Sequence, residues 1–392
     1  MRVLIGSESF YPNVSGVSVT ALNLATYLVE KGHEVVVAAP SPTGEFYIED
    51  FPGGIKVWRV FSVSNPWRSN FKVSLFPERR LMALVDEWQP DVIHLQDPNA
   101  ICLALIKAAD KWGIPTLISH HFTLDYILTY VRLLKPVHPY IKRMLTKRMI
   151  KIYNSCRYVL CPSETVKTYL VEGGLKVPVI AISNGVDLDR FFSYEPESSI
   201  RASFGLPALP IVLYVGRIDP EKSIKTLLQA APMVLANCKV HFVLCGNGKA
   251  VNSIKRRIDR HHLEQHFTFL GPFDHESSDL PRVYQTASCF VIPSPYESQS
   301  IVTLEAMASG LPVVAAASGA LPELVGDGEN GFLFNPGDPG DLAMKLNMLL
   351  DNTEMRKRMG LCSLEKVVQH NLEENLHKIE EIYTRVVGNE TA

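Results

Sequence analysis

Two glutamates, Glu297 and Glu305, are separated by seven residues in the stretch PSPYESQSIVTLEAMASGLPVV, residues 293–314. Carboxylates accept hydrogen bonds from vicinal hydroxyl groups such as those of a sugar or a ribose. Glu297 falls in a loop after a predicted strand, and Glu305 falls a little over one turn into a helix predicted over 301–309. The N–H groups at the start of that helix would suit a phosphate. On spacing alone, however, a helix-capping acid and a surface acid explain the two glutamates better than a ligand-binding site does.

Two cations follow another predicted strand. The stretch GRIDPEK, residues 216–222, places Arg217 and Lys222 after Gly216, at the end of a strand predicted over 211–215. Positive charges at this position would stabilise a diphosphate as it leaves a sugar. In isolation, two solvated surface cations explain the stretch equally well.

The N-terminal loop SESFYPNVSG, residues 7–16, is rich in turn-forming residues and precedes a helix predicted over 17–31. Gly16 would permit close approach of the backbone to a ligand, and the helix start would bind an anion. A plain turn is the better explanation of this loop alone. It does not have the GxGxxG pattern, so the sequence gives no support to dinucleotide binding.

The elements that must position these residues alternate between strand and helix. In the first half of the chain, strands are predicted over 2–6, 34–39, 91–95 and 115–119, with a helix over 100–112. The pattern restarts after residue 192, with strands predicted over 211–215, 240–245, 267–270, 289–292 and 312–315. Nearly continuous apolar strands indicate parallel α/β sheets. We predict two doubly wound, Rossmann-like domains facing each other across a cleft, over residues 1–185 and 195–370.

A last helix, predicted over 372–387, has apolar residues on one face, and we expect residues 371–392 to pack back across the first domain. The length of 392 residues also favours two domains. A net charge of −2 gives no overall field that would attract nucleic acid. Seven cysteines without a CxxC pair fit reduced thiols in the cytoplasm. No run of about 18 apolar residues predicts a membrane span.

The ordered set of motifs resembles the family 4 glycosyltransferases, a retaining group with the GT-B fold that uses nucleotide-activated sugars. The match runs through most of the chain and is specific as a set. The motifs are YPNVSG with KGHEV, DVIHLQDP, SHHF, PSE with SNGVDLDRF, GRIDPEK, CGNG, PSPYES with EAMASGLPVV, and SGALPELVGDGENGFLF. The resemblance implies an N-terminal domain for the acceptor and a C-terminal domain for the nucleotide sugar.

The resemblance also implies roles for individual residues. Glu305 would bind the ribose hydroxyls, Glu297 would bind hydroxyls of the donor sugar, and Arg217 and Lys222 would neutralise the diphosphate. His121, or its neighbour His120, would touch the donor sugar near the anomeric carbon. The remaining donor contacts implied are the backbone of Gly16, Gly216, Ser300 and Ile301, the loop residues Ser298 and Gln299, and Gly246 and Phe273 around the base. Because fixed cations would serve the diphosphate, we expect no cofactor and no essential metal.

Many members of the family read EGFG where this chain reads ESQS, residues 297–300. Chains with Gln at this place resemble a subset that includes glycolipid-forming glucosyltransferases. The resemblance therefore favours UDP-glucose as donor, with GDP-mannose second, and a membrane lipid such as diacylglycerol or a lipid-linked sugar as acceptor. A soluble sugar or small-molecule acceptor is the alternative. A sugar-nucleotide epimerase and a non-catalytic nucleotide-sugar binder are alternatives of other classes.

Residues 139–157 are basic in an otherwise neutral chain. Arg143, Lys147 and Lys151 recur every four residues, beside an apolar stripe of Ile141, Leu145, Met149 and Ile152. A basic amphipathic helix can lie on an anionic membrane. A helix packed on its own domain with a solvated basic face explains the pattern slightly better by itself. The resemblance to lipid-modifying enzymes nevertheless leads us to expect peripheral attachment at the cytoplasmic face of a membrane.

Overall fold

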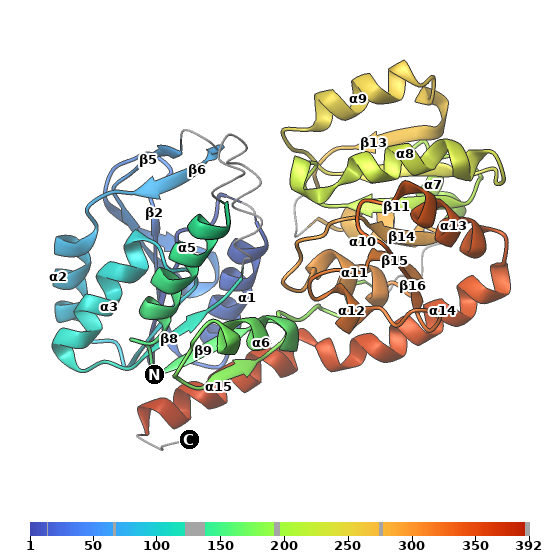
Figure 1. The fold of residues 1–392 in the computed structure, drawn as a ribbon. Coiled ribbons are helices and arrows are strands. Elements are labelled where there is room, and N and C mark those ends of the chain that lie inside the picture. Colours follow the sequence, from blue (N-terminus) through green and yellow to red (C-terminus); the bar gives the residue numbers. More distant parts are fainter. Residues whose placement is uncertain (14, 66–67, 122–137, 192–196, 274–276, 389–392) are drawn as a thin grey trace. The chain divides into compact units, whose positions relative to one another are not determined.

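The computed structural model describes residues 1–388 except 14, 66–67, 122–137, 192–196 and 274–276. The chain forms two compact units (Figure 1). The first contains the described parts of residues 1–184 and the C-terminal stretch from Glu373, and the second contains residues 185–372. Each is an α/β domain with its own sheet, so the predicted fold class of two Rossmann-like domains is confirmed. The start predicted for the second domain, residue 195, lies outside the described residues.

The sheet of the first unit has, among the described residues, eight strands in the order β10-β9-β8-β7-β1-β2-β4-β3. All neighbours are parallel except β3 and β4. This antiparallel edge was not predicted; it forms because Gly53 and Gly54 turn the chain at φ of 78° and 80°. The strands are β1 (Arg2–Gly6), β2 (Glu34–Pro40), β3 (Tyr47–Phe51), β4 (Ile55–Val60), β7 (Val92–Leu95), β8 (Thr116–Ser119), β9 (Tyr158–Cys161) and β10 (Val179–Ala181), with a separate hairpin of β5 (Ser62–Asn65) and β6 (Arg68–Ser74).

The sheet of the second unit has, in the part of the chain that is described, six parallel strands in the order β13-β12-β11-β14-β15-β16. They are β11 (Ile211–Val215), β12 (His241–Cys245), β13 (Phe267–Leu270), β14 (Cys289–Ile292), β15 (Val313–Ala316) and β16 (Gly331–Phe334). The chain extends from β11 to β13 on one side and then returns to continue from β14 on the other. The crevice between the carboxyl ends of β11 and β14 is therefore a topological switch point, where open α/β sheets bind their ligands. In the first unit, β1 and β7 form the equivalent point.

Helices pack around the strands of each sheet (Figure 1), and each unit has its own apolar core. Among the described residues, no helix combines the length and apolar character needed to cross a membrane. The helices of the first unit are α1 (Gly16–Glu30), α2 (Glu78–Trp88), α3 (Ala100–Trp112), α5 (His138–Tyr153) and α6 (Glu164–Glu172). Those of the second are α7 (Glu197–Ser203), α8 (Ile224–Leu235), α9 (Val251–Arg260), α10 (Asp279–Gln285), α11 (Ile301–Ala308), α12 (Leu321–Leu324), α13 (Pro339–Leu350) and α14 (Thr353–Val367).

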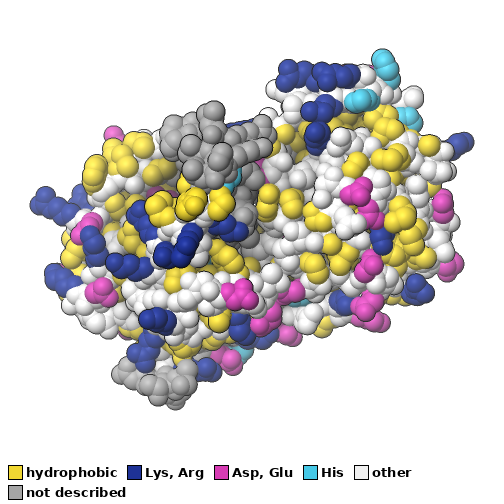
Figure 2. Space-filling model, in the orientation of Figure 1, with side chains coloured by type: hydrophobic (Ala, Val, Ile, Leu, Met, Phe, Trp, Pro, Cys, Tyr) yellow, Lys and Arg dark blue, Asp and Glu magenta, His cyan; other side chains and the backbone are white. Residues whose placement is uncertain are grey.

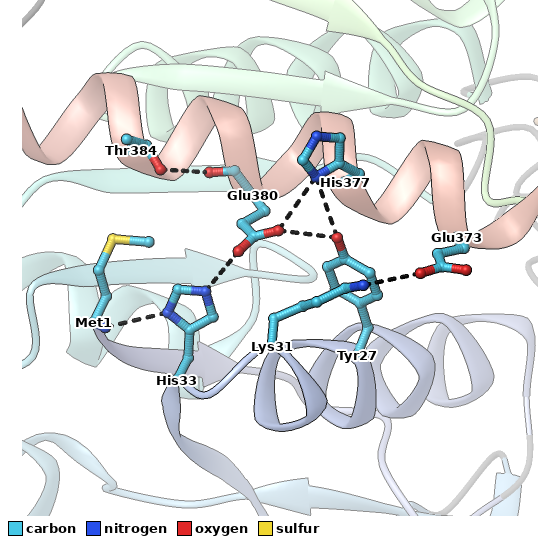
Figure 3. Close-up of polar contacts among 8 residues, drawn as sticks. All are labelled: Met1, Tyr27, Lys31, His33, Glu373, His377, Glu380 and Thr384. Carbon is cyan, nitrogen blue, oxygen red and sulfur yellow. Dashed lines mark hydrogen bonds and ion pairs between the residues drawn. The ribbon is translucent and has the colours of Figure 1, made fainter.

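The last helix, α15 (Leu372–Val387), packs on the first unit as predicted. Its Glu380 lies at the centre of a polar cluster, shown in Figure 3. The Tyr27 hydroxyl donates a hydrogen bond to Glu380 at 2.9 Å, and His33 Nε2 lies 2.8 Å from the same carboxylate. His377 completes the cluster, and Lys31 pairs with Glu373 one turn away at 2.9 Å. Residues at the two ends of the chain thus stabilise one domain together.

Candidate active site

Two glycines bring the loops after β11 and β12 into direct contact. Gly216 and Gly246 have φ of 138° and 144°, which L side chains rarely adopt. A Cβ at Gly246 would lie only 2.0 Å from the Gly216 carbonyl oxygen. The glycine at 246 is therefore required for the packing of two backbones, whatever contact it makes with a ligand.

Arg217 and Lys222 follow β11, as expected, and both form ion pairs within the second unit. Arg217 contacts Asp219 and Glu221, both nearly buried, at 2.5 and 3.0 Å. Lys222 ends the short 3-10 helix Pro220–Lys222, and its Nζ lies 2.6 Å from Glu297 Oε1. The structure thus brings Lys222 and Glu297 together across the switch point between β11 and β14.

The loop that carries Glu297 is supported from behind by the loop after β15. The Ala320 N–H donates to the Glu297 carbonyl at 3.0 Å, and the Ser318 hydroxyl donates to the Pro295 carbonyl at 2.8 Å. Gly319, at φ of 59°, is so close that a Cβ there would lie 2.5 Å from the Glu297 carbonyl oxygen. The motif SGALP, for which the sequence predicted no role, therefore positions the backbone of Glu297.

Glu305 lies on α11 and is only 2% exposed. The Tyr284 hydroxyl donates to its Oε2 at 2.6 Å. Burial, followed by the charge of Glu305, raises the pKa of Tyr284, so the tyrosine remains a neutral donor. The hydrogen bond fixes one carboxylate oxygen on the protein side, and a carboxylate has further acceptor capacity for a ligand.

The start of α11 has an unusual backbone. Ser300, its N-cap residue, has φ of 98°, and no side-chain hydrogen bond caps the helix. Positive φ strains a residue that has a Cβ, and the family often has glycine here, as noted above. The chain keeps a glycine-like loop although its sequence is ESQS. The Thr303 N–H donates to the Ser300 carbonyl at 3.1 Å. The uncapped N-terminus leaves the backbone N–H groups of Ile301 and Val302 to an anion, next to the predicted Ser298 and Gln299.

The second unit therefore brings together most of the predicted donor site. Its cations lie after β11, and its carboxylates lie after β14 or on α11. Such a set can compensate the charge of a diphosphate while carboxylate oxygens accept hydrogen bonds from hydroxyl groups. Phe273 follows β13, and its ring packs edge-on against Phe204 at 5.8 Å between ring centroids. Its contact with the base stays a prediction.

The predicted residues of the first unit lie at the ends of its own strands. His121 follows β8, and its Nε2 lies 2.8 Å from the Gln96 side-chain oxygen. Burial lowers the pKa of His121 to about 4, so the ring is neutral at pH 7. His120 is only 1% exposed, and its Nδ1 lies 2.8 Å from the Tyr153 hydroxyl oxygen. Gly16 is the first residue of α1, which is capped by Ser15.

Sequence reasoning missed four residues at the switch points. Gln96 positions His121, and Asp219 holds Arg217. Glu8 contacts Asp97 between β1 and β7, where the Glu8 N–H donates to Asp97 Oδ2 at 2.8 Å. The signal that could have found them is their position, since each follows directly or closely on the carboxyl end of a predicted strand.

Family comparisons agree with this architecture. Residues 14–190 match the family model described as Glycosyltransferase Family 4, and residues 197–361 match the one described as Glycosyl transferases group 1. Sulfoquinovosyl transferase SQD2 of Arabidopsis thaliana is 30% identical, over 94% of this chain and 70% of that protein. Alpha-monoglucosyldiacylglycerol synthase of Streptococcus pneumoniae is 24% identical, over 96% and 85%. GDP-mannose-dependent alpha-mannosyltransferase of Mycobacterium tuberculosis is 28% identical, over 86% and 85%.

Solved structures show the same fold. Sucrose-phosphate synthase from Thermosynechococcus elongatus superposes with a TM-score of 0.79 at 22% identity, covering 100% of both chains. Anabaena HepE in complex with UDP-glucose superposes with a TM-score of 0.76 at 21% identity, covering 98% of this chain and 99% of that one. Fold and site together define a glycosyltransferase of the GT-B class. The chain belongs to family 4 of these enzymes and is a hexosyltransferase.

Proposed function

We propose that this enzyme transfers a hexose from a nucleotide sugar to a hydroxyl acceptor with retention at the anomeric carbon, using UDP-glucose in preference to GDP-mannose. The observation that carries the proposal is the contact of Lys222 with Glu297 beside Arg217, at the switch point of the second unit. One cation for the diphosphate and one carboxylate for the sugar are thereby held within hydrogen-bonding distance of each other.

The reaction follows from these groups. The bond between the anomeric carbon and the diphosphate oxygen breaks, and the acceptor oxygen forms a new bond to that carbon on the same face. A donor phosphate oxygen takes the acceptor proton, so no protein base is needed. Arg217 and Lys222 stabilise the charge on the leaving diphosphate. Glu297 binds sugar hydroxyls, Glu305 binds the ribose, and neutral His121 donates or accepts a hydrogen bond near the anomeric carbon.

We further propose a lipid hydroxyl as the acceptor. Relatives with the name alpha-monoglucosyldiacylglycerol synthase support this class. A soluble acceptor remains the alternative, and the GDP-mannose-dependent relative supports the second donor. Membership of a transferase family favours transfer over the epimerase and the non-catalytic binder.

Helix α5 supports membrane attachment through a different face from the one the sequence indicated. The predicted apolar stripe faces the core of its own unit: Met149 is buried and Ile152 packs beside it. The exposed apolar side chains are Tyr140 and Met144, at 76% and 62% exposure. Lys and Arg side chains mix with hydrophobic ones on the surface where α5 lies (Figure 2). Exposed aromatic and cationic groups on one face are typical of helices that lie at a membrane interface.

The test of the function is a donor panel. UDP-glucose, UDP-galactose and GDP-mannose are each incubated with the protein, and release of the nucleoside diphosphate is measured with and without a total lipid extract. We expect UDP-glucose to be used fastest and the extract to accelerate release, with a hexosylated lipid found by mass spectrometry. Faster use of GDP-mannose would contradict the donor assignment. Absence of turnover with every donor would contradict the transferase proposal itself.

A further inference from the structure

A buried tyrosine on α10, Tyr284, contacts the helix that carries Glu305, and the reaction proposed above gives it no role. Its hydroxyl has one proton and two acceptors nearby, Glu305 Oε2 at 2.6 Å and the Val302 carbonyl oxygen at 3.2 Å. The hydrogen bond to the carboxylate is the stronger of the two, because it is shorter and its acceptor carries a charge. Both acceptors belong to α11, so the hydroxyl is fixed against one face of that helix.

The ring of Tyr284 is held by two other aromatic rings. Phe191 packs edge-on against it, with 5.6 Å between the ring centroids and an interplanar angle of 77°. Phe290 on β14 packs at 5.9 Å and 46°. All three side chains are buried, and aromatic pairs in such arrangements stabilise each other beyond the area that they bury. The position of the Tyr284 hydroxyl is therefore set by the core of the second unit before any ligand binds.

Glu305 lies between the groups predicted for the base and for the diphosphate. Cys245 ends β12, directly before Gly246, which is predicted to lie around the base. Burial, and then the charge of Glu305, raise the pKa of the Cys245 thiol to about 12, because the thiol is close to the carboxylate. On the other side, α11 begins at Ile301, whose N–H is predicted to contact the diphosphate. In a nucleotide the ribose joins these two parts, so a ribose is the group that Glu305 would meet.

The direction of the Glu305 oxygens decides whether this carboxylate can accept hydrogen bonds from a ribose. Without the Tyr284 hydroxyl, Oε2 would lose its donor in a side chain that is almost completely buried. Loss of one partner of a buried hydrogen bond costs about 1–3 kcal/mol. The carboxylate would then turn toward another donor or bind a proton. Either change removes acceptor capacity from the ribose, although Tyr284 itself does not touch the nucleotide.

We propose that Tyr284 is the positioning residue for the ribose, and that it makes the donor site selective for ribonucleotides over deoxyribonucleotides. The inference rests on the transferase function proposed above, in which Glu305 binds the ribose. It extends that function with a residue that determines which nucleotides the second unit accepts.

Binding of nucleotide analogues tests the selectivity without any need for turnover. UDP, 2′-deoxy-UDP and 3′-deoxy-UDP are titrated into the full-length protein, and calorimetry measures each Kd. We expect the wild type to prefer UDP over at least one analogue by about tenfold or more, the scale of a hydrogen bond to a charged group. Tyr284→Phe keeps the ring and removes only the hydroxyl. It should weaken UDP binding roughly tenfold and binding of that analogue by less than about twofold, so that the preference disappears.

A second tyrosine supplies a matched control. Tyr214 on β11 is as deeply buried as Tyr284, but its hydroxyl donates to the Arg217 carbonyl at 2.7 Å. Tyr214→Phe therefore removes a buried hydroxyl on the diphosphate side. It should change the affinities for all three nucleotides by the same factor and leave the preference for UDP intact.

Two further variants show whether Tyr284 acts through Glu305. Glu305→Gln should itself lower the preference for UDP, and Tyr284→Phe should lower it no further in that background, because residues that act through one another are not additive. Phe191→Leu keeps the hydroxyl but loosens the support of the ring. It should lower the preference by about threefold, the scale of an aromatic pair.

The outcomes separate this inference from the function on which it rests. No binding of UDP by the wild type contradicts the proposed function. Binding of UDP with a preference that survives in both Tyr284→Phe and Phe191→Leu overturns the inference alone. Equal loss of preference in Tyr214→Phe overturns it as well, because the effect would then be a general one of buried hydroxyl groups. Equal binding of all three nucleotides by the wild type removes the ribose contact of Glu305 and the inference with it.

Discussion

The contact between Lys222 and Glu297 couples the two halves of the proposed donor site at the level of single atoms. In the structure each side chain is the other's ion-pair partner at 2.6 Å. A nucleotide sugar would supply new partners to both, a diphosphate for the lysine and hydroxyl groups for the glutamate. The pair therefore keeps two charged groups oriented before the donor arrives, which is the preorganisation that electrostatic catalysis requires.

Lys222→Ala removes a charge that would stabilise the leaving diphosphate. We expect kcat to fall by about two to three orders of magnitude, the range found for loss of a preorganised charge stabiliser. The value of kcat is measured as the steady-state release of UDP from UDP-glucose. Lys225→Ala, on the exposed face of the adjacent α8, serves as the control and should behave like the wild type. Near-normal turnover of Lys222→Ala would remove the lysine from the mechanism.

Gly319→Ala tests the support behind Glu297. The new Cβ would meet the Glu297 carbonyl oxygen at 2.5 Å, and the residue would also be held at a positive φ. We expect a lower melting temperature and at least a tenfold loss of kcat/KM, because small displacements of positioned groups are costly in catalysis. Gly328→Ala is the matched control, since Gly328 also has a positive φ, of 82°, and no atom lies within 4 Å of a Cβ added there. Equal loss in both variants would show that the contact with Glu297 is not the cause.

At the scale of elements, α15 depends on the charge of one carboxylate. Burial alone would raise the pKa of Glu380, but hydrogen bonds from His33, Tyr27 and His377 outweigh it and lower the pKa. A carboxyl group with a depressed pKa stabilises the fold at pH values above its unfolded pKa, and that stabilisation is lost as the pH falls through the folded pKa. The contribution of Glu380 should therefore be complete at neutral pH, decrease as the pH falls below the ordinary pKa of 4.5, and disappear below the lower pKa of the folded state.

Glu380→Gln measures that contribution. We expect the free energy of unfolding of the variant to be lower by about 1.5–3 kcal/mol at pH 7, the range for a hydrogen bond to a charged group. The difference should shrink toward zero in acid. Urea unfolding followed by circular dichroism at several pH values provides the measurement. Glu381→Gln alters an exposed neighbour on the same helix and is the control. A difference that does not depend on pH would contradict the electrostatic explanation.

The exposed cations of α5 permit a second test at this scale. Arg143→Glu combined with Lys147→Glu should weaken binding to vesicles of phosphatidylglycerol and phosphatidylcholine by at least about tenfold, since each cation near an anionic surface contributes about 1 kcal/mol. Flotation at low salt provides the measurement. Arg256→Glu combined with Arg260→Glu makes the same change of charge on exposed α9. If both double variants lose binding equally, or the wild type does not bind, α5 is not the membrane contact.

At the scale of the whole molecule, the two Rossmann-like units have different predicted roles. The second unit carries the cations and carboxylates proposed for the donor, and the first carries His121, which is proposed to contact the donor sugar. Because fixed cations, Arg217 and Lys222, would compensate the diphosphate, we expect transfer without an added metal. Activity should stay within about twofold when a chelator is present. Activity that disappears with chelator and returns with Mg²⁺ would show that the two side chains are insufficient.

The sequence by itself determined the local elements and the class of chemistry. Strands β11, β13 and β14 and helix α3 have the bounds predicted from apolar runs and helix ends, because these signals depend on near neighbours in the chain. The ordered motifs also predicted the family, which the comparisons confirm. Sequence reasoning missed the strands β3, β4, β5, β6, β9, β10 and β16. Short or polar strands carry little periodicity of their own, and even β4 has only six residues.

Only the tertiary structure decided which groups are partners. Lys222 meets Glu297 and Glu8 meets Asp97 because β11 pairs with β14 and β1 with β7, and strand order is not written in any local pattern. Tyr27 and Glu380 lie 353 residues apart in the chain and share a hydrogen bond. The carboxylates were visible in the sequence. Their burial and their partners depend on how distant segments pack together, and these in turn determine their protonation.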